Sequence, residues 1–183
     1  MSAVTSANVG GGRKVAEFLL EGGHKKIGYI AGWEGASTQR DREAGFMQGL
    51  RAAGFDLHAR EVGNFVLELA RDATLRMFAQ DPPDAVFVAN DHMAMAVMDT
   101  LRFDLNLKVP QDVSVVGYDD VSTAAWRAYD LTTVRQPANR MVAETVDILL
   151  SKINDASAAP RRVEIDAPLI VRGSARIPEG WKS

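Results

Sequence analysis

The chain has 183 residues, of which 46% are hydrophobic and 25% charged, and its formal net charge is −3. This length and composition allow a globular unit that folds without disulfides or a structural metal, and the net acidity argues against a nucleic-acid surface, which usually carries a basic patch. There is no cysteine, which excludes disulfides and thiol catalysis, and no run of about 20 apolar residues, which excludes a membrane span.

The N-terminal third alternates helical and extended patterns. Residues 1–14 lack a basic segment followed by an apolar one, so we expect no secretory signal and a cytoplasmic protein. A broad apolar stripe ending in Gly-Gly predicts a helix over residues 11–22. A strand at 26–32 and a helix at 38–54 follow, and residues 61–65 are a candidate short strand.

The same alternation continues to the C-terminal end. The predicted elements are a helix at 68–81, a strand at 85–89, a helix at 91–103, a strand at 113–118, a short helix at 123–129, a strand at 131–136, a long amphipathic helix at 138–153 and one or two strands within 162–174. Strands that alternate with helices indicate an α/β protein with a parallel sheet. The two central strands are almost continuously apolar, as expected when helices cover both faces in a three-layer α/β/α architecture.

Polar residues follow two of these apolar strands. "AVFVAND" ends in Asn90 and Asp91, and "VSVVGYDD" ends in Asp119 and Asp120. In an open parallel sheet, ligands bind in the crevice beyond the carboxyl ends of the strands. We expect Asp91 and Asp120 to cap the following helices, which leaves Asn90 and Asp119 to face the crevice.

Neighbouring loops supply further candidates for a ligand site. Arg40 and Arg42 lie after the strand at 26–32, where Arg40 could equally be a solvated residue of the helix start, and Gln136 follows the strand at 131–136. This mixture of donors and acceptors, with little net charge, suits a neutral, hydroxyl-rich ligand. Phe65 or Trp33 could stack on a sugar ring, although core packing is the alternative for Phe65.

Taken together, the chain resembles the effector-binding core of the LacI/GalR (lactose-repressor) family of bacterial transcription regulators. The matching segments occur in the family's order: "GHKKIGYIAG" (23–32), Ser37 with "REAGF" (42–46), "PDAVFVANDHMAMAVM" (83–98), "VPQDVSVVGYDD" (109–120), "LTTVRQP" (131–137) and "PLIVRGS" (168–174). The resemblance implies a type I periplasmic-binding-protein-like fold and a cytoplasmic repressor that senses a sugar or nucleoside-like effector.

The resemblance also implies which residues contact the effector. They are Arg42, Asn90, Asp119 and Gln136, with Phe65 near the family's stacking aromatic and Arg40 as a weaker candidate. No metal or other cofactor is implied. Family members dimerise partly through this region, so we expect a homodimer. Met95 or Met98 of the helix at 91–103 could serve if exposed, but core packing is the favoured role for each.

By the same resemblance, residues 24–136, with 162–174, form the C-terminal subdomain of the effector-binding domain. Residues 1–23 and 137–161 are then pieces of an incomplete N-terminal subdomain. The DNA-binding headpiece is expected to lie outside this chain, so operator DNA would be bound only through that missing part.

Two alternatives remain open at this stage. Asp91, Asp119 and Asp120 could hold Mg²⁺ in a hydrolase or phosphotransferase, but the three histidines have no ligand spacing and "GGGRK" does not match a phosphate loop. We therefore expect no enzymatic activity. The same fold also serves the periplasmic solute-binding proteins of sugar transporters, and the repressor-like "VPQDVSVVGYDD" favours the regulator.

Overall fold

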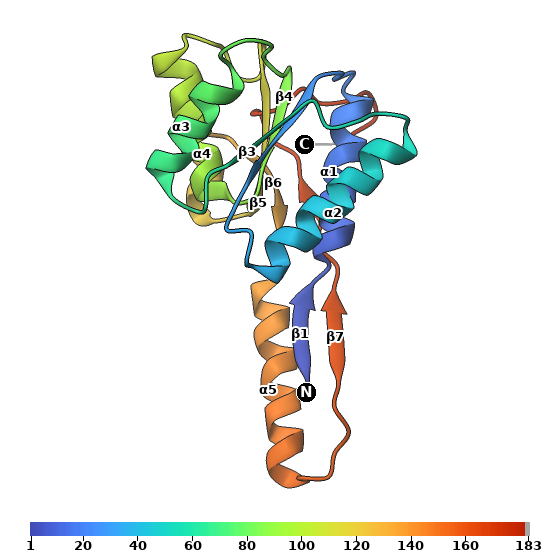
Figure 1. Ribbon diagram of the computed structural model, residues 1–183. Coiled ribbons are helices and arrows are strands. Elements are labelled where there is room, and N and C mark those ends of the chain that lie inside the picture. Colours follow the sequence, from blue (N-terminus) through green and yellow to red (C-terminus); the bar gives the residue numbers. More distant parts are fainter. Residues whose placement is uncertain (182–183) are drawn as a thin grey trace.

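The computed structural model describes residues 1–181, and a six-stranded sheet forms its centre (Figure 1). The strand order is β3-β2-β4-β5-β6-β8, with every neighbouring pair parallel except the antiparallel pair of β6 and β8. The strands are β2 (Ile27–Ala31), β3 (Ala59–Val62), β4 (Ala85–Val88), β5 (Ser114–Asp119), β6 (Thr132–Arg135) and β8 (Leu169–Ile170). The predicted three-layer α/β class is confirmed.

Helices cover both faces of this sheet. In Figure 1, α1 and α2 pack together on one side and α3 and α4 on the other. The helices are α1 (Asn8–Glu21), α2 (Ser37–Ala52), α3 (Leu67–Met77) and α4 (Asp91–Asp99), with α4 continuing into a π-helical segment, η1 (Thr100–Asp104). The short helix predicted at 123–129 is a 3₁₀ turn, η2 (Ser122–Ala125), followed by irregular chain.

The central strands are buried on both faces, which explains their continuous apolar sequences. All of β2 and β4, and β5 as far as Tyr118, lie in the interior. Tyr29, Phe46 and Phe87 are fully buried and form an aromatic cluster, with ring centroids 4.9–5.8 Å apart. Close packing of this cluster fixes α2 on the sheet, and α2 carries Arg42.

A smaller unit projects from the sheet (Figure 1). It consists of the parallel pair β1 (Ala3–Ser6) and β7 (Arg162–Ile165), with α5 (Ala138–Asn154) packed beside it. The chain crosses between the two units three times: from β1 to α1, from β6 to α5 and from β7 to β8. No helix within residues 1–181 is long and apolar enough to cross a membrane.

The packing differs from the expected domain division in two places. We expected residues 1–23 outside the sheet-bearing unit, but α1 packs along α2 and buries Phe18 and Leu19 in the main core. We also expected residues 162–174 to lie together, but β7 pairs with β1 whereas β8 pairs with β6. Strand β1 was not predicted, because four residues without clear alternation give too little sequence signal.

Candidate functional site

Arg42 is the centre of a polar cluster at the carboxyl edge of the sheet. Its side chain is 5% exposed, and its Nη2 lies 3.2 Å from Oδ1 of Asp119 at the end of β5. Its Nη1 donates to the Ala89 carbonyl at the end of β4, at 2.6 Å. The guanidinium carbon also lies 3.7 Å from the centre of the Tyr118 ring, a cation–π contact. Helix α2 and two adjacent strands therefore hold one cation in a fixed orientation.

Gln136 joins this cluster from the end of β6. Its Nε2 donates to Oδ1 of Asp119 at 2.5 Å, and its backbone N–H donates to the Asp119 carbonyl at 3.2 Å. Arg42 and Gln136 thus approach the same carboxylate oxygen, and Oδ2 of Asp119 can still accept a hydrogen bond from a ligand. Of the four residues predicted to share a hollow, Arg42 and Gln136 both contact Asp119.

Burial and backbone strain mark the end of β5 as unusual. Burial raises the pKa of Asp119 above its ordinary value, and the positive charge of Arg42 opposes that rise. Asp119 and Asp120 have φ angles of 122° and 56°, in a region that L-residues rarely adopt. Strain of this kind is frequently found at functional sites, where surrounding contacts maintain it.

Asn90 lies at the same edge of the sheet, but its side chain caps a helix, a role that we expected of Asp91. Its Oδ1 accepts a hydrogen bond from the Met93 N–H at 3.0 Å, which makes Asn90 the N-cap of α4. The cap is one residue earlier than predicted because the capping residue must be extended, and Asn90 has a φ of −152° whereas Asp91 is already helical. Capping uses only Oδ1, so Nδ2 remains compatible with ligand contact.

The predictions that Asp91 and Asp120 are helix caps are wrong. Asp91 is fully buried, and its carboxylate accepts hydrogen bonds from the Val121 N–H at 2.9 Å and the Thr133 hydroxyl at 2.6 Å. Asp120 forms ion pairs with Arg135 and Arg172, at 2.5 and 2.7 Å. Both acids link segments that are distant in sequence, which local capping patterns cannot reveal.

Phe65 and Arg40 are not among the contacts of the Arg42 cluster. The Phe65 ring lies against Gly32, just past the end of β2, and the residue is 37% exposed with a φ of 61°. It therefore lies at the same edge of the sheet and is partly exposed. Arg40, in the first turn of α2, is exposed and donates to the carbonyls of Glu34 and Gly35 in the preceding loop, at 3.3 Å each.

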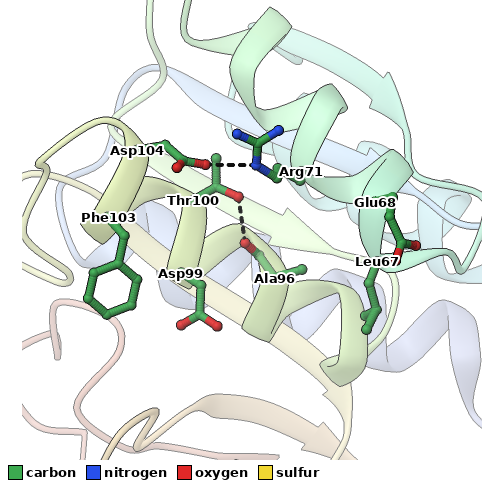
Figure 2. Close-up of a pocket in the computed structure, with 8 residues that line it drawn as sticks. All are labelled: Leu67, Glu68, Arg71, Ala96, Asp99, Thr100, Phe103 and Asp104. Atoms are coloured by element: carbon green, nitrogen blue, oxygen red, sulfur yellow. Dashed lines mark hydrogen bonds and ion pairs between the residues drawn. The ribbon is translucent and has the colours of Figure 1, made fainter.

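Two hollows lie near these elements. One, of about 230 Å³, borders the cluster at the start of α5 and is lined by Asp120, Arg135, Gln136, Pro137, Ala138, Asn139 and Arg140. The other, of about 330 Å³, is a groove between α3 and α4 that shares no residue with the cluster (Figure 2). In the groove, Arg71 donates to Asp104 at 2.8 Å, and Phe103 is 75% exposed.

The acids at the strand ends do not assemble a metal site. Within residues 1–181, no group of three or more His, Asp or Glu side chains is arranged to hold a metal ion. Asp91 faces Thr133, Asp120 faces two arginines and Asp119 faces Arg42. Their oxygens are directed at donors of the protein itself, so the arrangement favours hydrogen bonding to a ligand over cation binding.

The sequence analysis missed two participants, Asn8 and Tyr118. Asn8 Oδ1 accepts from Arg42 Nε at 3.0 Å, and the Tyr118 ring supports the guanidinium. Tyr118 belongs to the quoted "VVGYDD" but reads as a core residue, because it continues the apolar run. Asn8 lies more than 30 positions from Arg42 in sequence, so no local pattern connects the two.

Comparison with known proteins identifies the family to which the chain is similar. Residues 16–175 match the family described as periplasmic binding protein-like domain. The chain is 33% identical over 169 residues to the HTH-type transcriptional repressor PurR of Photobacterium profundum, covering 91% of this chain and 50% of PurR. It is 34% identical over 177 residues to the HTH-type transcriptional regulator CelR of Thermobifida fusca, covering 95% of this chain and 52% of CelR.

Solved structures agree in fold. A CelR–cellobiose complex superposes with a TM-score of 0.89 at 34% identity, covering 96% of this chain and 54% of that one. A dimeric Lac repressor superposes with a TM-score of 0.88 at 28% identity, covering 96% of this chain and 64% of that one. The chain thus spans about half the length of the curated relatives it matches.

Proposed function

Because the chain belongs to the periplasmic binding protein-like domain family, in the form of the effector-binding domain of LacI-type regulators, we propose that it binds a sugar or related small polar effector. The observation that carries this proposal is the contact of Arg42, Asp119 and Gln136 at one edge of the sheet. These groups both donate and accept hydrogen bonds, as the hydroxyls of a sugar require. The family is non-enzymatic, and the relatives compared above are a transcriptional repressor and a transcriptional regulator.

The proposed ligand contacts divide between polar groups and one ring. Arg42 donates through its terminal nitrogens, Asp119 accepts through Oδ2, and Asn90 and Gln136 contribute amide groups. Phe65, in the loop after β3, stacks on the apolar face of the sugar. Arg40 donates to carbonyls of the loop before α2, and we place it outside the site.

We further propose that the effector signal is passed to operator DNA by a headpiece outside this chain. Support comes from the names of the relatives, which are HTH-type regulators about twice as long as the part matched here. A regulator of this kind acts in the cytoplasm. The smaller unit of β1, β7 and α5 would then belong to an N-terminal subdomain that is incomplete in these 183 residues. Its exposed apolar side chains fit that proposal: Val142, Val146, Leu149, Leu150 and Ile153 on α5 are 47–77% exposed.

We also propose that the chain forms a homodimer, and the surface around the α3–α4 groove is the candidate dimer interface. Phe103 and Leu67 line the groove and are 75% and 50% exposed. Trp126, 60% exposed, follows η2, and Arg102 donates from η1 to the nearby Ala128 carbonyl. Exposed apolar patches of this kind often mark protein interfaces. Met95 and Met98, considered earlier, are buried instead.

The experiment that tests effector binding is calorimetry on the full-length protein with a panel that includes cellobiose, monosaccharides and nucleosides. We expect at least one saturable ligand, and Arg42→Ala should weaken its binding at least about tenfold, since hydrogen bonds to charged groups contribute about 1.5–3 kcal/mol each. Arg40→Ala is the matched control and should bind normally. A panel without any binding would overturn the function, and normal binding by Arg42→Ala would overturn the site.

A further inference from the structure

Asn8 connects the proposed site to the first crossing between the two units. It is the first residue of α1, directly after the β1–α1 crossing, and it is 3% exposed. Its Oδ1 accepts a hydrogen bond from Arg42 Nε at 3.0 Å. The two residues come from different helices, so this bond ties the position of the Arg42 guanidinium to the crossing segment.

The chemistry of the surroundings requires an amide at this position. The Asn8 oxygen faces two donors, Arg42 Nε and the Ser6 hydroxyl, the latter at 3.4 Å. The Asn8 nitrogen faces two acceptors, the Ser6 carbonyl at 3.0 Å and the Thr5 hydroxyl oxygen at 3.3 Å. Since Arg42 can only donate and a carbonyl can only accept, the orientation of the amide is determined by its partners.

The contacts of Arg42 with the protein leave two of its five N–H groups for a ligand. Arginine has five N–H donors, and three contacts engage it here: Nε with Asn8, Nη1 with Ala89 and Nη2 with Asp119. The Tyr118 ring fixes the plane of the group. The remaining two N–H groups are one on each terminal nitrogen, Nη1 and Nη2.

We propose that Asn8 is a positioning residue for effector binding, which orients Arg42 through Nε so that its terminal N–H groups face the ligand. This inference rests on the proposed function, because it specifies how one residue of that site is held. Asn8 would then connect a ligand at Arg42 with β1 of the smaller unit.

Two substitutions separate positioning from a purely structural role. Asn8→Ala removes both the acceptor for Arg42 and the donor for Ser6. Asn8→Asp keeps the acceptor but loses the donor. Both should lower the melting temperature, because both lose the bond to the Ser6 carbonyl, but only Asn8→Ala should release Arg42.

The first measurement does not need the natural ligand. In ¹H–¹⁵N NMR spectra of the full-length protein, the Arg42 Nε–H signal, assigned by its loss in Arg42→Lys, should exchange slowly with solvent. We expect slow exchange to persist in Asn8→Asp and to accelerate at least about tenfold in Asn8→Ala, as loss of a hydrogen bond to a charged group implies. Equal exchange in Asn8→Ala and wild type would overturn the positioning role.

The second measurement is affinity for a sugar that the calorimetric panel identifies. Asn8→Ala should bind it at least about tenfold more weakly, whereas Asn8→Asp should stay within about threefold of wild type. Equal losses in the two variants would show a structural role and overturn the proposal. If wild type binds no member of the panel, the proposed function fails, while the NMR result still decides whether Asn8 positions Arg42.

Discussion

At the residue scale, the molecule depends on side chains that each connect several segments. Asp91 is the most buried example: it begins α4, yet its carboxylate accepts from Val121 after β5 and from Thr133 in β6. Burial raises its pKa from an ordinary 3.8 to about 6, and the nearby charges of Asp119 and Asp120 add to that rise. Asp91 therefore combines a structural role with a measurable dependence on pH.

The pKa of Asp91 predicts how stability changes with pH. Because the folded state binds the Asp91 proton more tightly than the unfolded state, this contribution to stability is complete below the unfolded pKa and is lost as pH rises through about 6. Between pH 4.5 and 7.5, wild type should lose about 2 kcal/mol of unfolding free energy that Asp91→Asn does not lose. Urea unfolding at several pH values measures the difference.

Asparagine is a suitable replacement there, because its oxygen can accept from the Val121 N–H while its nitrogen donates to the Thr133 hydroxyl. Asp41→Asn, at an exposed position of α2, controls for the loss of one negative charge. Unfolding free energies of Asp91→Asn and wild type that run parallel over this pH range would contradict the prediction.

At the scale of elements, the crossing of α1 and α2 determines where Arg42 lies. The two helices approach so closely that a Cβ on Gly45 would lie 1.9 Å from the Val9 carbonyl oxygen, and one on Gly12 would lie 2.1 Å from the Arg42 carbonyl oxygen. Only glycine allows such an approach. Gly12 of the "GGG" at residues 10–12 is thus required for helix packing, and Gly45 lies one helical turn after Arg42.

We predict that Gly45→Ala destabilises the protein and weakens effector binding together. The added methyl group meets backbone atoms, which cannot rotate away, so the helices must separate at a cost of about 1–3 kcal/mol. Thermal unfolding and calorimetry of the same variant measure the two effects.

Gly10→Ala provides the matched control within α1. A Cβ at Gly10 would lie 3.7 Å from the Ala7 Cβ, an ordinary contact, and alanine favours helices over glycine by about 0.5–1 kcal/mol. This variant should be as stable as wild type or more stable. If Gly45→Ala behaved in the same way, close helix contact would not be what positions α2.

At the scale of the whole molecule, two units share three crossings, and the proposed ligand cluster lies beside two of them. Asn8 follows the crossing from β1, and Gln136 precedes the crossing to α5. Both contact the Arg42–Asp119 pair directly. A ligand at this pair would therefore contact the groups that join the two units, which is the arrangement a sensor needs.

The proposed dimer also belongs to this scale. Replacing Phe103 by serine removes a ring that lines the α3–α4 groove (Figure 2) and is 75% exposed, so little packing within the chain is lost. If the groove surface is the dimer interface, this change should weaken dimerisation at least about tenfold without lowering the melting temperature of the monomer. Light scattering coupled to gel filtration of the full-length protein measures the shift.

Trp33→Ser is the control for that experiment, because Trp33 is also an exposed aromatic residue, 59% accessible, but lies in the loop after β2. It should leave the oligomeric state unchanged. An unchanged dimer in Phe103→Ser, or dissociation of Trp33→Ser instead, would place the interface elsewhere.

The sequence by itself determined the order and type of most elements, the parallel sheet and the strand-end positions of Asn90, Asp119 and Gln136. Hydrophobic periodicity and strand ends are local properties, so they can be recognised from neighbouring residues. Tertiary structure alone decided that Asn8 and Tyr118 hold Arg42, that Asp91 ties three segments together, and that α1 belongs with the main sheet. Those outcomes depend on contacts between residues far apart in the chain, whose geometry exists only after the helices have packed.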